Sequence, residues 1–181
     1  MKKRLLIVIS LLLLPGLGAA QQRVAGFIEE MPTDKLKRLF PRAVAFAPRG
    51  EVDPLHFKVY AVDPNSPGAK PIGYAFWTTD LVPEQLGYHG HIHMLIGMDT
   101  TGSLTGVIVD WNTEPYADIS IEKPEFPKMF VGKSILDKFV AGEDVDIMSR
   151  ATITVRAAAR EIRDASRMVA KAVLTPDALK R

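Results

Sequence analysis

The sequence contains no cysteine among its 181 residues. That absence excludes disulfide bonds, iron–sulfur clusters, thiolate zinc sites and haem attached through cysteine. It also leaves no N-terminal cysteine for a lipoprotein anchor. Stability must therefore come from an apolar core, and a chain of this length with 47% hydrophobic residues is long enough to build one in a single domain.

Net charge is also small, at +2. Lys2 to Arg4 precede the apolar run Leu5 to Leu14, and small residues follow up to Ala20. This order predicts a secretory signal peptide over residues 1–20, because the run is shorter than the roughly 20 apolar residues of a spanning helix. The alternative is an uncleaved N-terminal anchor. We therefore expect a periplasmic or otherwise extracytoplasmic protein.

Removing this leader lowers the Lys and Arg count from 23 to 20, against 21 Asp and Glu, so the mature chain carries a charge near −1. Nothing in this balance indicates nucleic-acid binding. After the leader we expect an N-terminal arm and first strand region over 21–70, and a core over 71–175.

The patterns along the chain predict an α+β fold, in which helices pack against a twisted antiparallel sheet. Apolar residues alternate in four segments, which predicts strands at 55–62, 72–79, 91–98 and 104–111. Short helices are expected at 35–40 and 131–140, and an irregular loop at 112–127.

The strongest helical pattern lies near the C-terminus. Its apolar positions step by three and four, which predicts one buried stripe made of Val155, Ala158, Ile162, Ala165, Val169 and Ala172. Arg156, Arg160, Arg163 and Arg167 fall on the opposite side, as a solvated face or a docking site for an acidic partner. Three hydroxyl residues, Ser149, Thr152 and Thr154, precede or open this helix, where free N–H groups and the helix dipole favour an anion. They could cap the helix, hold a phosphate or carry one.

The segment Asp146-x-x-Ser149-Arg150-Ala151-Thr152-x-Thr154 resembles the flavinylation motif of the FMN-binding domain family. Domains of that family occur in the sodium-pumping quinone reductase, in the related Rnf complex and in the regulatory flavoprotein of nitrous oxide reductase. The last threonine of the motif carries FMN as a phosphoester, which here implies Thr154. The motif usually has glycine where this sequence has Arg150, although an arginine beside a phosphate is chemically sensible.

Further similarities to the family lie in the expected order over residues 71–173. They include Gly73-Tyr74, Gly87-Tyr88-x-Gly90, Asp99-x-x-Gly102 and Thr113-Glu114-Pro115. The resemblance implies that Tyr88 and one histidine line the flavin pocket and that Glu114 touches the isoalloxazine or ribityl part; the alternative for Glu114 is a solvated loop carboxylate. It also implies phosphate or backbone contacts for Ser149 and Thr152, with capping as the alternative. For Asp146 it implies a role in orienting the loop and helping the metal of the attaching enzyme, with a solvated turn carboxylate as the alternative.

The histidines His89, His91 and His93 alternate, so on a strand they would project from one face and could bind copper or zinc. They could equally line the flavin pocket or be ordinary surface or core residues.

The resemblance implies an exported electron-transfer flavoprotein, rather than an enzyme with its own substrate, since no catalytic triad, paired carboxylate site or P-loop is evident. Its expected partners are a flavin transferase for attachment and a membrane or periplasmic redox protein. Two alternatives remain: a module of the same fold without covalent flavin, and a histidine-based metal-binding protein.

Overall fold

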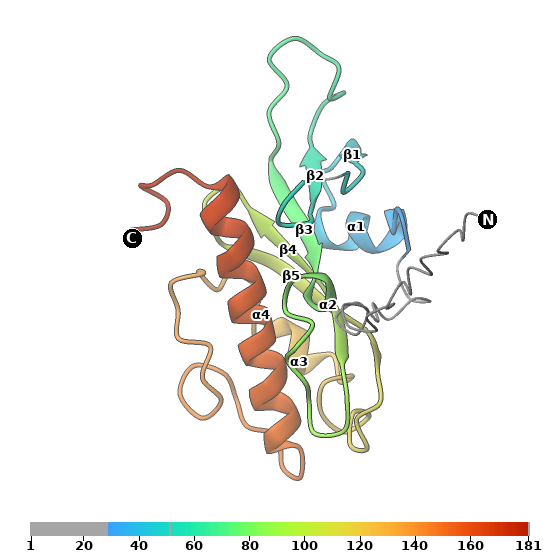
Figure 1. Cartoon of the computed structure of the whole chain (residues 1–181), viewed down its shortest axis with the longest axis vertical. Helices are drawn as coiled ribbons and strands as arrows, with labels where there is room; N and C mark the ends of the chain where they lie inside the picture. Colours follow the sequence, from blue (N-terminus) through green and yellow to red (C-terminus); the bar gives the residue numbers. More distant parts are fainter. Residues whose placement is uncertain (1–28, 51, 181) are drawn as a thin grey trace, which may run out of the picture.

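The computed structural model describes residues 29–50 and 52–180 (Figure 1). The predicted signal peptide, its cleavage point and the alternative anchor all lie outside these residues. No helix in the described part of the chain is both long enough and apolar enough to cross a membrane.

The centre of the molecule is one antiparallel sheet whose five strands follow chain order. The strands are β1 (Ala45–Ala47), β2 (Phe57–Tyr60), β3 (Gly73–Trp77), β4 (Ile92–Asp99) and β5 (Leu104–Asn112). Four of them were predicted, at slightly different bounds. The three-residue strand β1 was not predicted, because it is too short to show an alternating pattern.

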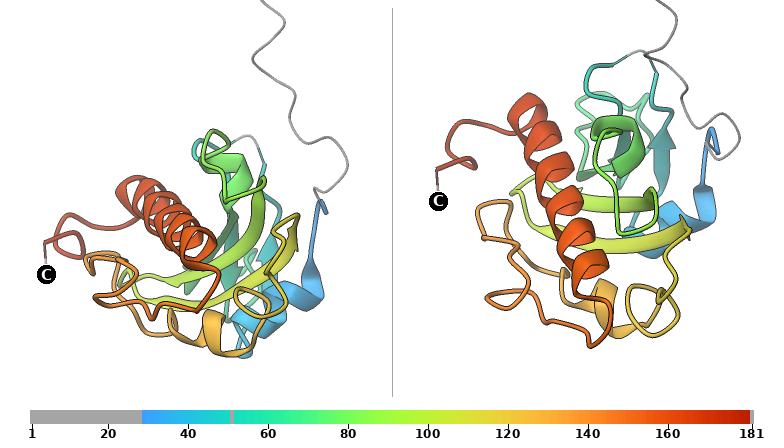
Figure 2. Two further views of the ribbon diagram at one scale, coloured as in Figure 1. Left: turned by 90° about the horizontal axis from the view of Figure 1, so that it is seen from below. Right: turned by 60° about the horizontal axis from the view of Figure 1, so that its bottom comes forward.

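Helices cover both faces of this sheet (Figure 2). The long helix α4 (Thr152–Val173) lies on one face and α1 (Thr33–Leu39) on the other, while the short helices α2 (Thr78–Leu81) and α3 (Glu125–Lys128) occupy connections. The predicted α+β class, with a long C-terminal helix packed on an antiparallel sheet, is confirmed.

Strand β4 divides the core because its side chains alternate between the faces. Ile92, Met94 and Ile96 pack with α4, whereas Leu95 packs with α1 on the other side. The predicted inner stripe of α4 is buried as far as Val169, but Ala172 is exposed, because Ala170 and Val173 face the core in the last turn and Ala172 lies off that face.

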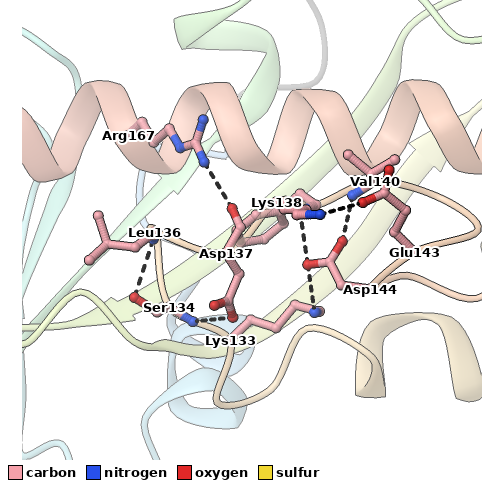
Figure 3. Close-up of polar contacts among 10 residues, drawn as sticks. Lys133, Ser134, Leu136, Asp137, Lys138, Val140, Glu143, Asp144 and Arg167 are labelled. Atoms are coloured by element: carbon pink, nitrogen blue, oxygen red, sulfur yellow. Dashed lines mark hydrogen bonds and ion pairs between the residues drawn. The ribbon is translucent and has the colours of Figure 1, made fainter. Parts of the chain in front are cut away.

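The expected helix over 131–140 is wrong: this segment is an irregular loop. Gly132 and Phe139 have left-handed φ angles of 80° and 56°, which a right-handed helix excludes. The Asp144 carboxylate accepts the N–H groups of Phe139 and Val140, at 3.0 and 2.7 Å, and the Lys133 ammonium at 3.0 Å. Arg167 of α4 donates to the carbonyls of Ile135 and Asp137, which fastens the loop to the helix (Figure 3).

Candidate functional site

Thr154 is the third residue of α4, and its side chain faces the protein interior with an exposed fraction of 3%. Its hydroxyl Oγ1 donates a short hydrogen bond to Oε2 of Glu114. Thr154 is therefore not a helix cap. The N-cap position is Ala151, and no side chain makes a capping hydrogen bond there.

Glu114 lies in the loop after β5, with an exposed fraction of 6%. Besides Thr154, its carboxylate accepts the backbone N–H groups of Tyr88, His89 and Gly90 at 2.9, 2.7 and 3.2 Å. Glu114 thus joins three segments that are far apart in sequence: the turn before β4, the loop after β5 and the first turn of α4.

These hydrogen bonds decide the charge of Glu114. Burial alone would raise its pKa, but the four donors stabilise the anion and hold the pKa below the ordinary value of 4.5. The group is therefore a carboxylate at neutral pH, with four donors directed at its two oxygens.

The glycines of the turn are needed for this arrangement. A Cβ atom on Gly87 would lie 2.5 Å from Oε1 of Glu114, and one on Gly90 would lie 2.6 Å from Oγ1 of Thr113. Both distances are closer than non-bonded atoms approach, so a larger residue would displace the Thr113–Glu114 segment. This close approach explains the spacing Gly87-Tyr88-His89-Gly90 that the sequence displays.

Arg150 stands in the left-handed region, with φ of 67°. That conformation is the one glycine adopts without steric cost, which gives a physical reason for glycine at this position of the motif. Arg150 and Ser149 also line an open hollow of about 530 Å³, together with Ile119, Lys123, Glu125 and Met148. Neither Thr154 nor Glu114 lines this hollow.

The other predicted residues take different places. Asp146 and Ser149 are exposed, Thr152 is half-buried, and Ala151 is buried. The Tyr88 ring is 61% exposed, so within the described chain the contact of Tyr88 with the site is made by its backbone N–H.

The three histidines do not act as one group. His89 gives a backbone N–H to Glu114, whereas His93 is buried on the α1 face and stacks on Trp77 with 4.2 Å between ring centroids. Burial lowers the pKa of His93, so the ring is neutral. Among residues 29–50 and 52–180, no three His, Cys, Asp or Glu side chains are grouped as a metal ion would require.

One residue of the region was not predicted from the sequence. Glu161 is 2% exposed, and its buried Oε1 has no hydrogen-bond partner among the described residues. Burial raises its pKa to about 8, and the nearby Glu114 charge adds to the effect. Glu161 lies seven residues, or two helical turns, after Thr154. This spacing places both residues on the same face of the helix, which is how the sequence could have shown that Glu161 faces inward.

Comparison with known families then identifies the region around this site. The model of the FMN-binding domain family matches residues 87–167, a span that begins at the glycine turn and includes Glu114 and the whole hydroxyl segment. No curated protein matches the chain. The match indicates FMN as the cofactor.

Proposed function

Residues 87–167 belong to the FMN-binding domain family, and from that premise we propose that FMN is bound covalently, as a phosphoester on Oγ1 of Thr154. One observation carries the choice of residue. Thr154 is the hydroxyl residue of the segment that the fold turns inward and joins to a buried carboxylate, whereas Ser149 and Thr152 are less buried.

The start of α4, rather than the immediate partner of Thr154, offers groups that suit a phosphate. Helix α4 begins at Thr152, and its first free N–H groups and helix dipole favour an anion. The neighbouring hollow is lined by two cations, Arg150 and Lys123, against one carboxylate, Glu125. Ile119 and Met148 give it an apolar wall for a ring system. These residues hold the group, while FMN itself supplies one- or two-electron transfer.

The role that follows is electron transfer between redox partners outside the cytoplasm. The basic start Lys2 to Arg4 and the apolar run after it support export. A covalent link suits an exported domain, because a dissociated flavin would be lost by dilution. The proposed partners are a flavin transferase for attachment and a membrane or periplasmic redox protein for the electrons.

The test is the mass of the protein after coexpression with a flavin transferase. We expect an FMN increment on the mature chain and flavin absorbance that survives acid precipitation. Thr154→Ala should remove both, whereas the control Thr175→Ala, an exposed threonine outside the family match, should retain them. An increment that persists in Thr154→Ala would move the attachment site elsewhere.

A second candidate is non-covalent binding by the same fold, and two observations favour it. Thr154 is only 3% exposed, so an attaching enzyme gains access only when the covering segments move, and Arg150 replaces the motif's glycine. This candidate predicts an unchanged protein mass and a flavin that acid precipitation releases.

A further inference from the structure

In the hydrogen bond between Thr154 and Glu114, the threonine hydroxyl is the donor and the carboxylate is the acceptor. A threonine hydroxyl is a weak nucleophile until a base removes its proton. In this structure the proton of Oγ1 already points to a carboxylate, which leaves the oxygen lone pairs for an electrophile. We propose that Glu114 is the base that accepts the Thr154 proton when FMN is attached, an inference that rests on the attachment site proposed above.

The reaction balances without any redox step. A phosphoester with an alcohol requires an activated phosphate, and a flavin dinucleotide supplies one as its phosphoanhydride. Oγ1 bonds to the phosphorus next to the flavin, the bond from that phosphorus to the bridging oxygen breaks, and adenylate leaves with the electron pair. The hydroxyl proton passes to Glu114 and from there to solvent. Protein kinases use an aspartate in the same way, to accept the proton of a substrate hydroxyl.

The carboxylate is held in place for this task. Three backbone N–H groups of the 88–90 turn fix its orientation, so its reach to Oγ1 does not depend on a flexible rotamer. Preorganised hydrogen bonds of this kind keep a base in position. The same donors keep it ionised, as a proton acceptor must be.

The other carboxyl groups nearby are unsuited to this role. Asp146 is exposed, and Glu161, which approaches Glu114 from α4, is kept protonated by burial. Within the described chain, Glu114 is the carboxylate that hydrogen-bonds to Thr154. Glu161 of α4 interacts with it through charge, and Tyr88 and His89 of the turn donate backbone N–H groups to it.

A purely structural role for Glu114 makes a different prediction. In that case the carboxylate only ties the turn to α4, and its loss would lower stability without changing how the attachment rate depends on pH. A base role changes that dependence, because a variant without the carboxylate must give its proton to water or hydroxide.

The experiment is single-turnover attachment to the full chain, prepared without FMN and mixed with flavin adenine dinucleotide and excess flavin transferase. The readout is the time course of the FMN mass increment. We expect Glu114→Gln to slow attachment by about 100-fold or more. The ratio of the unsubstituted rate to the variant rate should fall as pH rises, and taking the ratio removes the transferase's own pH dependence. Glu122→Gln, an exposed glutamate of the same loop, is the matched control and should behave as the unsubstituted chain.

Two further measurements separate chemistry from folding. Glu114→Asp keeps a carboxylate and should recover part of the rate that Glu114→Gln loses, with near-ultraviolet circular dichroism reporting the fold of each variant. If neither variant folds, the unsubstituted chain still tests the proposal, because transfer of the proton to a base in the rate-limiting step should give a slower reaction in deuterium oxide. No isotope effect there, a Gln variant that reacts at the full rate, or a rate ratio independent of pH would each overturn the base role.

Failure of this inference differs from failure of the proposed attachment. If Glu114→Gln gains FMN as fast as the unsubstituted chain, Thr154 remains the attachment site and only the base role of Glu114 is wrong. If the unsubstituted chain gains no FMN, both the attachment site and the base role are wrong.

Discussion

At the scale of single residues, two buried glutamates a short distance apart have opposite protonation. Glu114 receives four hydrogen bonds and stays ionised, whereas Glu161 receives none at Oε1 and stays neutral. Burial raises the pKa of both groups, and the four donors reverse that effect at Glu114 alone. The charge of Glu114 also favours the neutral form of Glu161, because two adjacent anions would repel.

The state of Glu161 predicts a dependence of stability on pH. The unfolded group ionises near 4.5 and the folded group near 8, so the free energy of unfolding should decrease as pH rises between these values. Glu161→Gln should remove this decrease and raise stability at pH 7 by on the order of 3 kcal/mol. Urea unfolding of the unsubstituted chain and of Glu161→Gln at several pH values measures this change in the free energy of unfolding. Equal pH slopes in the two proteins would contradict the assignment.

The sequence could identify Thr154 but not its partner. The hydroxyl motif is local, so its residues were recognisable without a structure. The bond from Thr154 to Glu114 spans 40 positions and depends on how the loop after β5 meets α4, which no local pattern encodes. Likewise, the sequence showed that Arg150 replaces a glycine, while the φ of 67° supplies the reason that glycine is usual there.

Arg150 leads to a second prediction. A residue with a Cβ in the left-handed region costs roughly 1–2 kcal/mol, so Arg150→Gly should raise the free energy of unfolding, by about 1 kcal/mol after the entropy of a freer unfolded chain is subtracted. Arg156→Gly is the matched control. It lies exposed within α4 and should instead lower stability by about 1 kcal/mol. Thermal unfolding of both variants tests the pair, and a destabilised Arg150→Gly would show that the side chain makes a compensating contact.

At the scale of elements, the loop over 131–145 shows how an apolar pattern can mislead. Ile135 and Phe139 are four residues apart and both buried, as in a helix. Their burial arises instead from a loop wrapped around the Asp144 carboxylate, which takes the N–H groups that a helix would use. A single acidic side chain after the segment therefore decides its conformation, and periodicity cannot detect that.

Asp144 gives a third prediction. Its two backbone hydrogen bonds and its Lys133 partner outweigh partial burial and lower its pKa from 3.8 to about 2. The stabilisation is therefore complete above pH 4 and is lost as pH falls towards 2. Asp144→Asn should lower the free energy of unfolding at neutral pH by about 2 kcal/mol, and the difference should vanish in acid. The exposed Glu143→Gln should have little effect, and an acid-independent deficit in Asp144→Asn would refute the charge explanation.

At the scale of the whole molecule, the fold depends on both faces of the sheet. Alternation in four strands and one amphipathic helix was enough to predict the α+β class. It could not show that α1, which lies before the family match, covers the reverse face of β4 and β5. A Cβ on Gly106 would lie 2.9 Å from Leu39, so the glycine lets α1 lie directly on the sheet.

This packing predicts that the core expected over 71–175 is not self-sufficient. Leu36, Leu39 and Phe40 are buried against Leu95 and Ile108. Burial of each such side chain contributes about 1.5–3 kcal/mol, and three together approach the total stability of a typical domain, about 5–15 kcal/mol. A chain that begins at residue 71 should therefore lack a cooperative unfolding transition and bind a hydrophobic dye, whereas one that begins at residue 29 should unfold cooperatively. Cooperative unfolding of the shorter chain would show that β3 to α4 form an independent unit and that α1 only adds to its stability.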